Sequence, residues 1–136
     1  MRAFPLQRPL LLLTATLALA ASARAITPAE LLAGYEAKAG APGSPERGKR
    51  LFTTNFGKPL GWSCSSCHTD DPTKPGTDDV TGKPIEPMAP AVNPARFIDR
   101  LKVENKLRLN CNDVVGRECT AQEKADLLAW MLGFKR

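Results

Sequence analysis

Ser63-Cys64-Ser65-Ser66-Cys67-His68-Thr69 is the stretch that decides the fold of this chain. It contains a Cys-x-x-Cys-His motif, which is typical of covalent c-type haem attachment. Two thiols three positions apart can each add across a haem vinyl group, and the adjacent imidazole then reaches one axial face of the iron. The motif therefore predicts Cys64 and Cys67 as thioether anchors of one haem c and His68 as its proximal ligand.

Two other interpretations of the motif are open. A Cys-x-x-Cys pair can be a redox dithiol, and Trp62 precedes this pair as a tryptophan precedes such dithiols. The chain lacks the βαβ pattern of a thioredoxin-like fold, however. Cys64, Cys67, His68 and one distant cysteine would also make the four ligands of a zinc site. The specificity of the complete motif favours haem.

The first 25 residues have the pattern of a secretory signal peptide. Arg2 and Arg8 precede an apolar run at residues 10–20, and Ala23-Arg24-Ala25 supplies an A-x-A cleavage site. The apolar run is too short for a comfortable membrane span, and an uncleaved anchor is the alternative. Cleavage after Ala25 predicts an exported, periplasmic protein of residues 26–136 that is not embedded in the membrane.

The charge of the mature segment argues against one class of partner. The formal net charge of the whole chain is +5 at pH 7. The predicted signal peptide holds three arginines and no acid, so 16 basic and 14 acidic residues remain and the net charge falls to +2. Ionised haem propionates would cancel most of this charge, so composition does not support nucleic-acid binding. Electrostatic docking would need a local patch, for which the sequence offers Lys49, Arg50, Lys58, Lys102, Lys106 and Arg108.

Three capping patterns predict helix starts. Thr27-Pro28-Ala29-Glu30 combines a capping box with proline at the first helical position, and Ser44-Pro45-Glu46 begins a second helix that carries Gly48 and Phe52. Thr120-Ala121-Gln122-Glu123 begins the terminal helix with another capping box. We expect the terminal helix to cross the second helix at Gly48, because glycine allows a close approach.

The middle of the chain combines a proline-rich segment with one further predicted helix. Asn93-Pro94 predicts a helix start, with helix up to about Asn110 that is either continuous or broken near Asp99. Six prolines between His68 and Phe97 predict an extended loop, and we expect a backbone carbonyl of this loop to accept the second N–H of the imidazole. The fold class is therefore all-α. Its leading architecture is a class I cytochrome c-like fold, in which helices and a proline-rich loop wrap around one covalently attached haem in a single domain of residues 26–136.

The sixth ligand of the iron is the open question. His68 is the only histidine, so the chain alone cannot build a bis-histidine iron. Met88 lies in the proline-rich loop, and its thioether is a soft ligand that stabilises ferrous iron. Asn110 would share one helix face with Val103 and Leu107, where a buried amide needs a partner and an iron could be one. A helix cap is the other interpretation of Asn110.

The two remaining cysteines are predicted to form a disulfide. Export permits disulfides, and with Cys64 and Cys67 committed to haem, Cys111 and Cys119 are left with each other. This bond would close a short loop and contribute about 2.5 kcal/mol in the chain-entropy model. It would also fix the position of the neighbouring asparagine. Asn112, inside the loop, is either a hydrogen-bond donor on the distal side of the haem or a turn residue, and the turn is favoured.

Eight segments of the mature chain are shared with one known family: Leu31 to Ala37, Glu46 to Gly48, Cys64 to His68, Thr81 to Ile85, Asn93 to Phe97, Asn110 to Asn112, Gly116 to Cys119 and Glu123 to Trp130. On these segments the chain resembles the sphaeroides haem protein family, a group of high-spin, oxygen-binding monohaem cytochromes c. The resemblance covers nearly the whole mature chain. Its asparagine–cysteine segment is much more specific than the haem motif.

The resemblance implies a class I cytochrome fold, an asparagine ligand on ferric iron that matches Asn110, and a disulfide that matches Cys111 with Cys119. It further implies that the asparagine leaves on reduction and that small diatomics bind in its place. A dihaem cytochrome c and a membrane b-type cytochrome are the implied redox partners. Met88 departs from the pattern, because a member of the family carries leucine at this position.

Three functional hypotheses follow. The first is a periplasmic monohaem cytochrome c that transfers electrons and, when ferrous, binds oxygen or nitric oxide after Asn110 leaves, because an amide suits ferric iron better than ferrous iron. The second is a plain electron-transfer cytochrome with His68 and Met88 as ligands. The third is an oxygen or nitric oxide reductase. No distal histidine or arrangement of acid and base residues supports an enzyme, so an electron carrier or ligand-binding haem protein is favoured.

Overall fold

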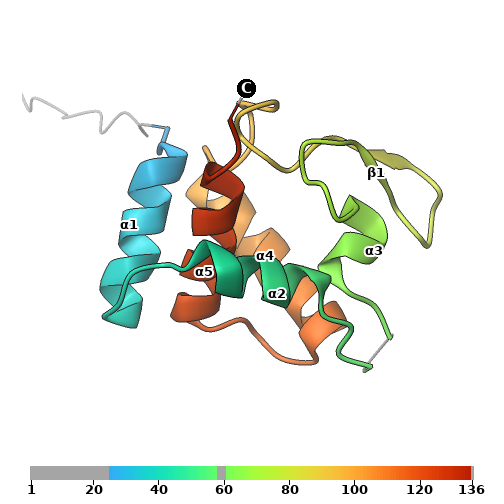
Figure 1. Cartoon of the computed structure of the whole chain (residues 1–136), viewed down its shortest axis with the longest axis horizontal. Coiled ribbons are helices and arrows are strands. Elements are labelled where there is room, and N and C mark those ends of the chain that lie inside the picture. The colour runs from blue at the N-terminus through green and yellow to red at the C-terminus, as the bar shows by residue number, and fades with distance from the viewer. Residues whose placement is uncertain (1–24, 58–60, 136) are drawn as a thin grey trace, which may run out of the picture.

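The computed structural model describes residues 25–57 and 61–135. Residues 1–24 of the predicted signal peptide, and Lys58, lie outside these ranges. The elements along the chain are α1 (Pro28–Ala39), α2 (Pro45–Thr53), α3 (Cys64–His68), β1 (Gly76–Thr77), β2 (Pro84–Ile85), α4 (Arg100–Val115) and α5 (Ala121–Leu132) (Figure 1). The described part of the chain contains no helix that is both long and apolar enough to span a membrane.

Local capping chemistry fixes the ends of the helices. The Thr27 hydroxyl accepts the backbone N–H of Glu30, and the Glu30 carboxylate accepts the backbone N–H of Thr27. The same reciprocal box begins α5 at Thr120, and the Ser44 side chain caps α2. Gly40 ends α1 with φ 72°, a left-handed conformation that glycine adopts without strain. The predicted helix starts at Thr27, Ser44 and Thr120 are confirmed.

The start of α4 corrects the sequence prediction. Residues 94–97 form turns instead of helix, and Phe97 has φ 61°, which no α-helix can contain. The helix begins only at Arg100, because the Asp99 carboxylate accepts the backbone N–H of Lys102 at 3.0 Å and acts as the N-cap. The prediction of a helix start at Asn93-Pro94 was therefore wrong, and its alternative of a break near Asp99 is close to the observed boundary.

The end of α4 also differs from the expectation. The helix continues past Asn110 to Val115 and ends at Gly116, which has φ 80°. Asn112 lies inside the helix and donates from its amide to the backbone carbonyl of Arg108 at 2.8 Å. The prediction of a turn at Asn112 was wrong, because a C-terminal glycine placed the real turn four residues further along the chain.

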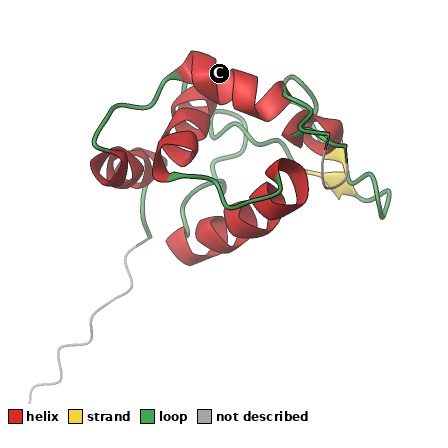
Figure 2. Cartoon of the chain, turned by 90° about the horizontal axis from the view of Figure 1, so that it is seen from below, coloured by secondary structure: helices red, strands yellow, loops and turns green. Residues whose placement is uncertain are grey.

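Helix α5 is the central element, and α1 and α2 both pack against it (Figures 1 and 2). A Cβ atom on Gly48 would lie 2.0 Å from the backbone oxygen of Asp126, so only glycine permits this approach of α2 to α5. The predicted crossing of the terminal helix with the helix of Gly48 is confirmed. The buried core around this crossing consists of Leu31, Tyr35, Phe52, Ala125, Leu128, Trp130 and Met131.

A buried carboxylate joins the same two helices. Asp126 in α5 is only 4% exposed, and its oxygens accept from the Arg47 guanidinium at 2.7 Å, the backbone N–H of Ser44 at 2.8 Å and the Gln122 amide at 2.9 Å. Burial alone would raise the pKa of Asp126. The three donors outweigh burial, and the net effect is a lowered pKa.

The proline-rich segment forms the predicted extended loop. Its regular structure is one short antiparallel pair, in which Gly76 of β1 is the partner of Ile85 in β2. A Cβ on Gly76 would lie 1.9 Å from the backbone oxygen of Cys67, so the loop packs tightly on α3. The loop then returns along the backbone of Pro72, whose carbonyl accepts the N–H groups of Met88 and Ala89, both at 2.9 Å.

We expect Gly48→Ala to destabilise the protein by about 3 kcal/mol or more. The new Cβ would clash with the backbone of α5, which cannot move aside as a flexible side chain could. Gly34→Ala in α1 is the matched control. Its new Cβ would meet only the end of the Arg100 side chain at 3.4 Å, so we expect a change of about 0.5–1 kcal/mol in the stabilising direction. Urea unfolding of both holoprotein variants measures the difference. Equal stability of the two variants would contradict the close contact.

We expect Asp126→Asn to lower the free energy of unfolding by about 1–3 kcal/mol at neutral pH. Because the folded-state pKa of Asp126 is lowered, its contribution is present above the ordinary carboxyl pKa of about 3.9 and is lost as the pH falls through the folded-state value. The stability difference from wild type should therefore shrink below about pH 4. Unfolding curves at several pH values test this, with the exposed Asp113→Asn as control. A difference that is independent of pH would refute the assignment.

Candidate haem-binding site

The predicted haem motif forms α3. Ser63 is its N-cap: the Ser63 hydroxyl accepts the backbone N–H of Ser66 at 3.2 Å, and the Ser66 hydroxyl accepts the backbone N–H of Ser63 at 3.1 Å. This box holds one short turn of helix in place. Within it Cys64 and His68 are four residues apart and lie on the same face. The capping hydrogen bonds of Ser63 and Ser66 therefore orient the first thiol and the imidazole toward the same space.

The two motif thiols are free and are not bonded to each other. Burial and, to a smaller extent, the neighbouring Cys67 thiol raise the pKa of Cys64 to about 11, although a backbone hydrogen bond opposes them. A thiol that stays protonated at neutral pH is a poor redox nucleophile, which argues against the dithiol interpretation. The zinc interpretation loses its fourth ligand, because Cys111 and Cys119 are bonded to each other at 1.99 Å.

The imidazole of His68 has the protonation state that a metal ligand needs. Burial first, and then the positive charge of Arg96, lower the pKa of His68, so the ring is neutral at pH 7. Its Nδ1 atom is buried and has no hydrogen-bond partner among the described residues. The expected carbonyl acceptor in the proline-rich loop is therefore not observed.

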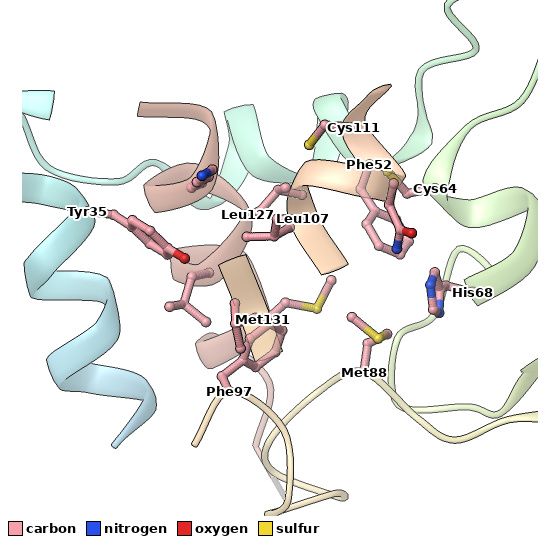
Figure 3. Close-up of a pocket in the computed structure, with 14 residues that line it drawn as sticks. Tyr35, Phe52, Cys64, His68, Met88, Phe97, Leu107, Cys111, Leu127 and Met131 are labelled. Atoms are coloured by element: carbon pink, nitrogen blue, oxygen red, sulfur yellow. The ribbon is translucent and has the colours of Figure 1, made fainter. Parts of the chain in front are cut away.

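A cavity with an empty volume of about 570 Å³ lies between α3, the loop and the helices. Figure 3 shows His68 at one end and Tyr35 at the other, with mostly apolar side chains between them. The lining residues are Tyr35, Phe52, Cys64, His68, Met88, Phe97, Val103, Leu107, Asn110, Cys111, Lys124, Leu127, Leu128 and Met131. Apolar walls, a free thiol and a neutral imidazole fit a covalently attached haem.

The structure brings most of the predicted site residues together. Cys64, His68, Met88 and Asn110 all line this cavity, whereas Cys67 lies in α3 outside the lining. Met131 belongs to the buried core and also reaches the cavity. Sequence reasoning did not single out Lys124 or Tyr35 as site residues.

Met88 reaches the cavity from a firmly held backbone. Besides the two bonds to Pro72, the carbonyl of Pro87 accepts from the Arg96 guanidinium at 2.9 Å and from the Asn93 amide at 3.1 Å. Arg96 is partly buried, and burial lowers its pKa. Hydrogen bonds to other residues of the loop therefore hold the backbone on both sides of Met88 in place.

Asn110 reaches the cavity from α4, as the sequence predicted for the face that carries Val103 and Leu107. The residue as a whole is exposed. The disulfide of the next residue, Cys111, leads to Cys119, which directly precedes the cap of α5. This bond joins the second half of α4 to the start of α5.

The predicted docking residues that the structure describes are all exposed. They lie on two helices, Lys49 and Arg50 on α2 and Lys102, Lys106 and Arg108 on α4. Their exposure is compatible with a docking patch, which stays a prediction.

The fold matches solved structures of cytochromes c. Oxidised SHP, described as an oxygen-binding cytochrome c, matches with a TM-score of 0.72 at 50% identity, over 79% of this chain and 96% of that chain. Oxidised cytochrome c'' from Methylophilus methylotrophus matches with a TM-score of 0.74 at 37% identity, over 80% of this chain and 95% of that chain. The protein is thus a cytochrome c of the class I type with one covalently attached haem c.

Related sequences narrow the class to a family. Cytochrome c-type protein SHP of Cereibacter sphaeroides is 53% identical over 123 residues, which are 89% of this chain and 95% of that protein. Cytochrome c'' of Methylophilus methylotrophus is 45% identical over 87 residues, 62% of this chain and 60% of that protein. Residues 38–131 also match a family model described as Domain of unknown function (DUF1924). The chain belongs to the sphaeroides haem protein family and to this domain family.

We expect the double variant Cys64→Ser/Cys67→Ser to lose covalent haem completely, because a serine hydroxyl does not form the thioether. Mass spectrometry of the denatured chain shows whether haem stays attached. The control is Cys111→Ser/Cys119→Ser, which removes the other two thiols and should keep the haem. Haem that remains covalently attached to the first variant would disprove the assignment of the anchors.

Proposed function

We propose that this protein is a periplasmic electron-transfer cytochrome whose ferrous haem binds small diatomics, oxygen or nitric oxide, after Asn110 leaves the iron. The observation that carries the proposal is that Asn110 lines the same cavity as His68, from a different wall. The similarity to SHP, an oxygen-binding cytochrome c, supports it.

Each residue of the site has a role in this proposal. Cys64 and Cys67 form the thioethers, and the neutral imidazole of His68 is the proximal ligand. When bound, the haem supplies the iron that accepts the electron and coordinates the diatomic. Asn110 would supply the second protein ligand in the ferric state. The largely apolar lining keeps water away from that position once the amide has left.

The displacement of Asn110 has a physical reason. A neutral amide oxygen is a hard, weak ligand, so its affinity falls when ferric iron gains an electron. The disulfide at Cys111 keeps this part of α4 attached to α5 while the side chain leaves, so the amide can return on oxidation. Cytochrome c'', which is similar to this chain, has a solution structure that concerns haem-ligand detachment.

A second candidate function is a plain electron carrier with His68 and Met88 as ligands. The observation in its favour is that the Met88 side chain lines the cavity too, and a thioether prefers ferrous iron. In that case reduction would tighten the sixth ligand and diatomics would be excluded.

Export and partners complete the proposal. Residues 1–25 would direct export and be removed after Ala25, which places the Cys111–Cys119 disulfide in an oxidising compartment. A dihaem cytochrome c and a membrane b-type cytochrome would exchange electrons with the haem, and the exposed basic residues of α2 and α4 would guide their docking.

We expect Asn110→Ala to change the ferric optical spectrum and to speed binding of nitric oxide to the ferric protein about tenfold, because a competing ligand is removed. Met88→Leu should leave the ferric spectrum and the high-spin ferrous spectrum unchanged. Asn112→Ala is the matched control, since it removes an exposed amide from the same helix. Spectra of the purified variants in both redox states, with and without carbon monoxide or nitric oxide, measure these effects.

The opposite pattern would favour the second candidate. A low-spin ferrous iron, with a ferric methionine charge-transfer band that only Met88→Leu removes, would rule out Asn110 as the ligand.

A further inference from the structure

Arg96 places a partly buried positive charge beside the cavity. Its Nε atom donates to the backbone carbonyl of Pro87 at 2.9 Å, and its Nη2 atom donates to the carbonyl of Glu86. Pro87 directly precedes Met88, and Phe97 directly follows Arg96. Met88 and Phe97 both line the cavity, and Figure 3 shows them along one side of it. The guanidinium therefore lies against the backbone that forms this wall.

The charge of Arg96 has no close counterion in the described part of the chain. Its hydrogen-bond acceptors are two backbone carbonyls, which carry no net charge, and the ion pairs of the described residues involve other basic side chains. The exposed Glu86 carboxylate acts only from a longer distance: it raises the pKa of Arg96, and burial lowers that pKa by more. An arginine keeps its proton even so. Its positive charge is therefore permanent, and solvent ions screen it less than they screen a surface charge.

The electrostatic effect of this charge extends to the proximal side of the site. Next to burial, the charge of Arg96 is the cause that lowers the pKa of His68, because two positive charges repel each other. Ferric iron held by His68 carries one more positive charge than ferrous iron. The same repulsion therefore disfavours the ferric state relative to the ferrous state.

We propose that Arg96 raises the reduction potential of the haem through its charge. The inference rests on the electron-transfer part of the proposed function, and it holds whether Asn110 or Met88 is the sixth ligand. The iron gains one electron from a donor protein, and the fixed guanidinium stabilises the less positive product. One unit charge at about 10 Å, with an effective dielectric constant of about 20, changes the equilibrium constant of reduction on the order of tenfold.

Potentiometric titration of the holoprotein tests the inference. We expect Arg96→Gln to lower the equilibrium constant of reduction about tenfold, which is about 59 mV for a one-electron couple. Arg96→Lys keeps the charge and should change the constant less than about threefold. The ferric and ferrous optical spectra of both variants should match those of wild type, because the ligands of the iron stay the same.

Two controls separate the charge from other effects. Asn93→Ala is the control for the contact, because the uncharged Asn93 amide donates to the same Pro87 carbonyl at 3.1 Å. Arg50→Gln in α2 is the control for net charge, because Arg50 is exposed to solvent. Both should change the constant less than about threefold. The effect of Arg50→Gln should vanish at high salt, whereas that of Arg96→Gln should persist.

Three results would mean that Arg96 acts by holding Met88 and would overturn the inference: an equal fall for Arg96→Gln and Arg96→Lys, an equal fall for Asn93→Ala, or a changed spectrum. An unchanged constant for Arg96→Gln would overturn it too. If Arg96→Gln does not attach haem, the exposed Glu86→Gln takes its place. It removes the charge that partly offsets Arg96 and should raise the constant about twofold or more. An unchanged or lowered constant would then overturn the inference.

The potentials are measured without any gas, so they are independent of diatomic binding. If the constants shift as expected and ferrous wild type binds neither oxygen nor nitric oxide, only the ligand-binding part of the proposed function fails. If the gases bind and the constants do not shift, this inference alone fails.

Discussion

The contact of Gly48 with the backbone of Asp126 is the constraint on which the site depends. It sets α2 directly on α5, so that the Phe52 ring meets the Trp130 ring with 5.0 Å between centroids. The same Phe52 ring lies 6.1 Å from the imidazole of His68. Through this series of rings the central helix supports the position of α3, and the buried Asp126 carboxylate holds the crossing from its polar side. The proximal half of the site is therefore built on close helix packing.

The distal wall is built differently. Over its 16 residues α4 buries only Cys111 and Val114, both near its C-terminal end. Val103 and Leu107 face the cavity and remain half-buried, so much of the apolar surface of α4 is covered only when the cavity is filled. A chain of this size buries only a small hydrophobic core. The haem supplies the apolar surface against which this helix packs. The disulfide at Cys111 and the Glu104–Lys124 pair tie α4 to α5.

Where local interactions determine the structure, the sequence was sufficient to predict it. Capping residues marked three helix starts, and the glycine of α2 marked its crossing with α5. The Asn93-Pro94 signal misled because the Asn93 side-chain oxygen accepts the backbone N–H of Ala95, two residues on in a turn, while Asp99 takes the role of helix cap. Tyr35 and Lys124 line the cavity only because of tertiary packing, which the spacing of residues along the sequence does not predict. Motif reasoning thus named the candidate anchors and both ligand candidates, and only the three-dimensional structure showed what surrounds them.

The two candidate sixth ligands stand on walls of unequal rigidity, and this difference bears on which of them can leave the iron. Moving the backbone at Met88 would break the bonds that Pro72 and Pro87 accept, at about 1–3 kcal/mol for each carbonyl left buried without a partner. Asn110 stands on a helix that is tied at separate points and shares little buried surface with its neighbours. A shift of α4 breaks no backbone hydrogen bond of the loop. A ligand that must detach and return with each electron is therefore better placed on α4 than on the loop.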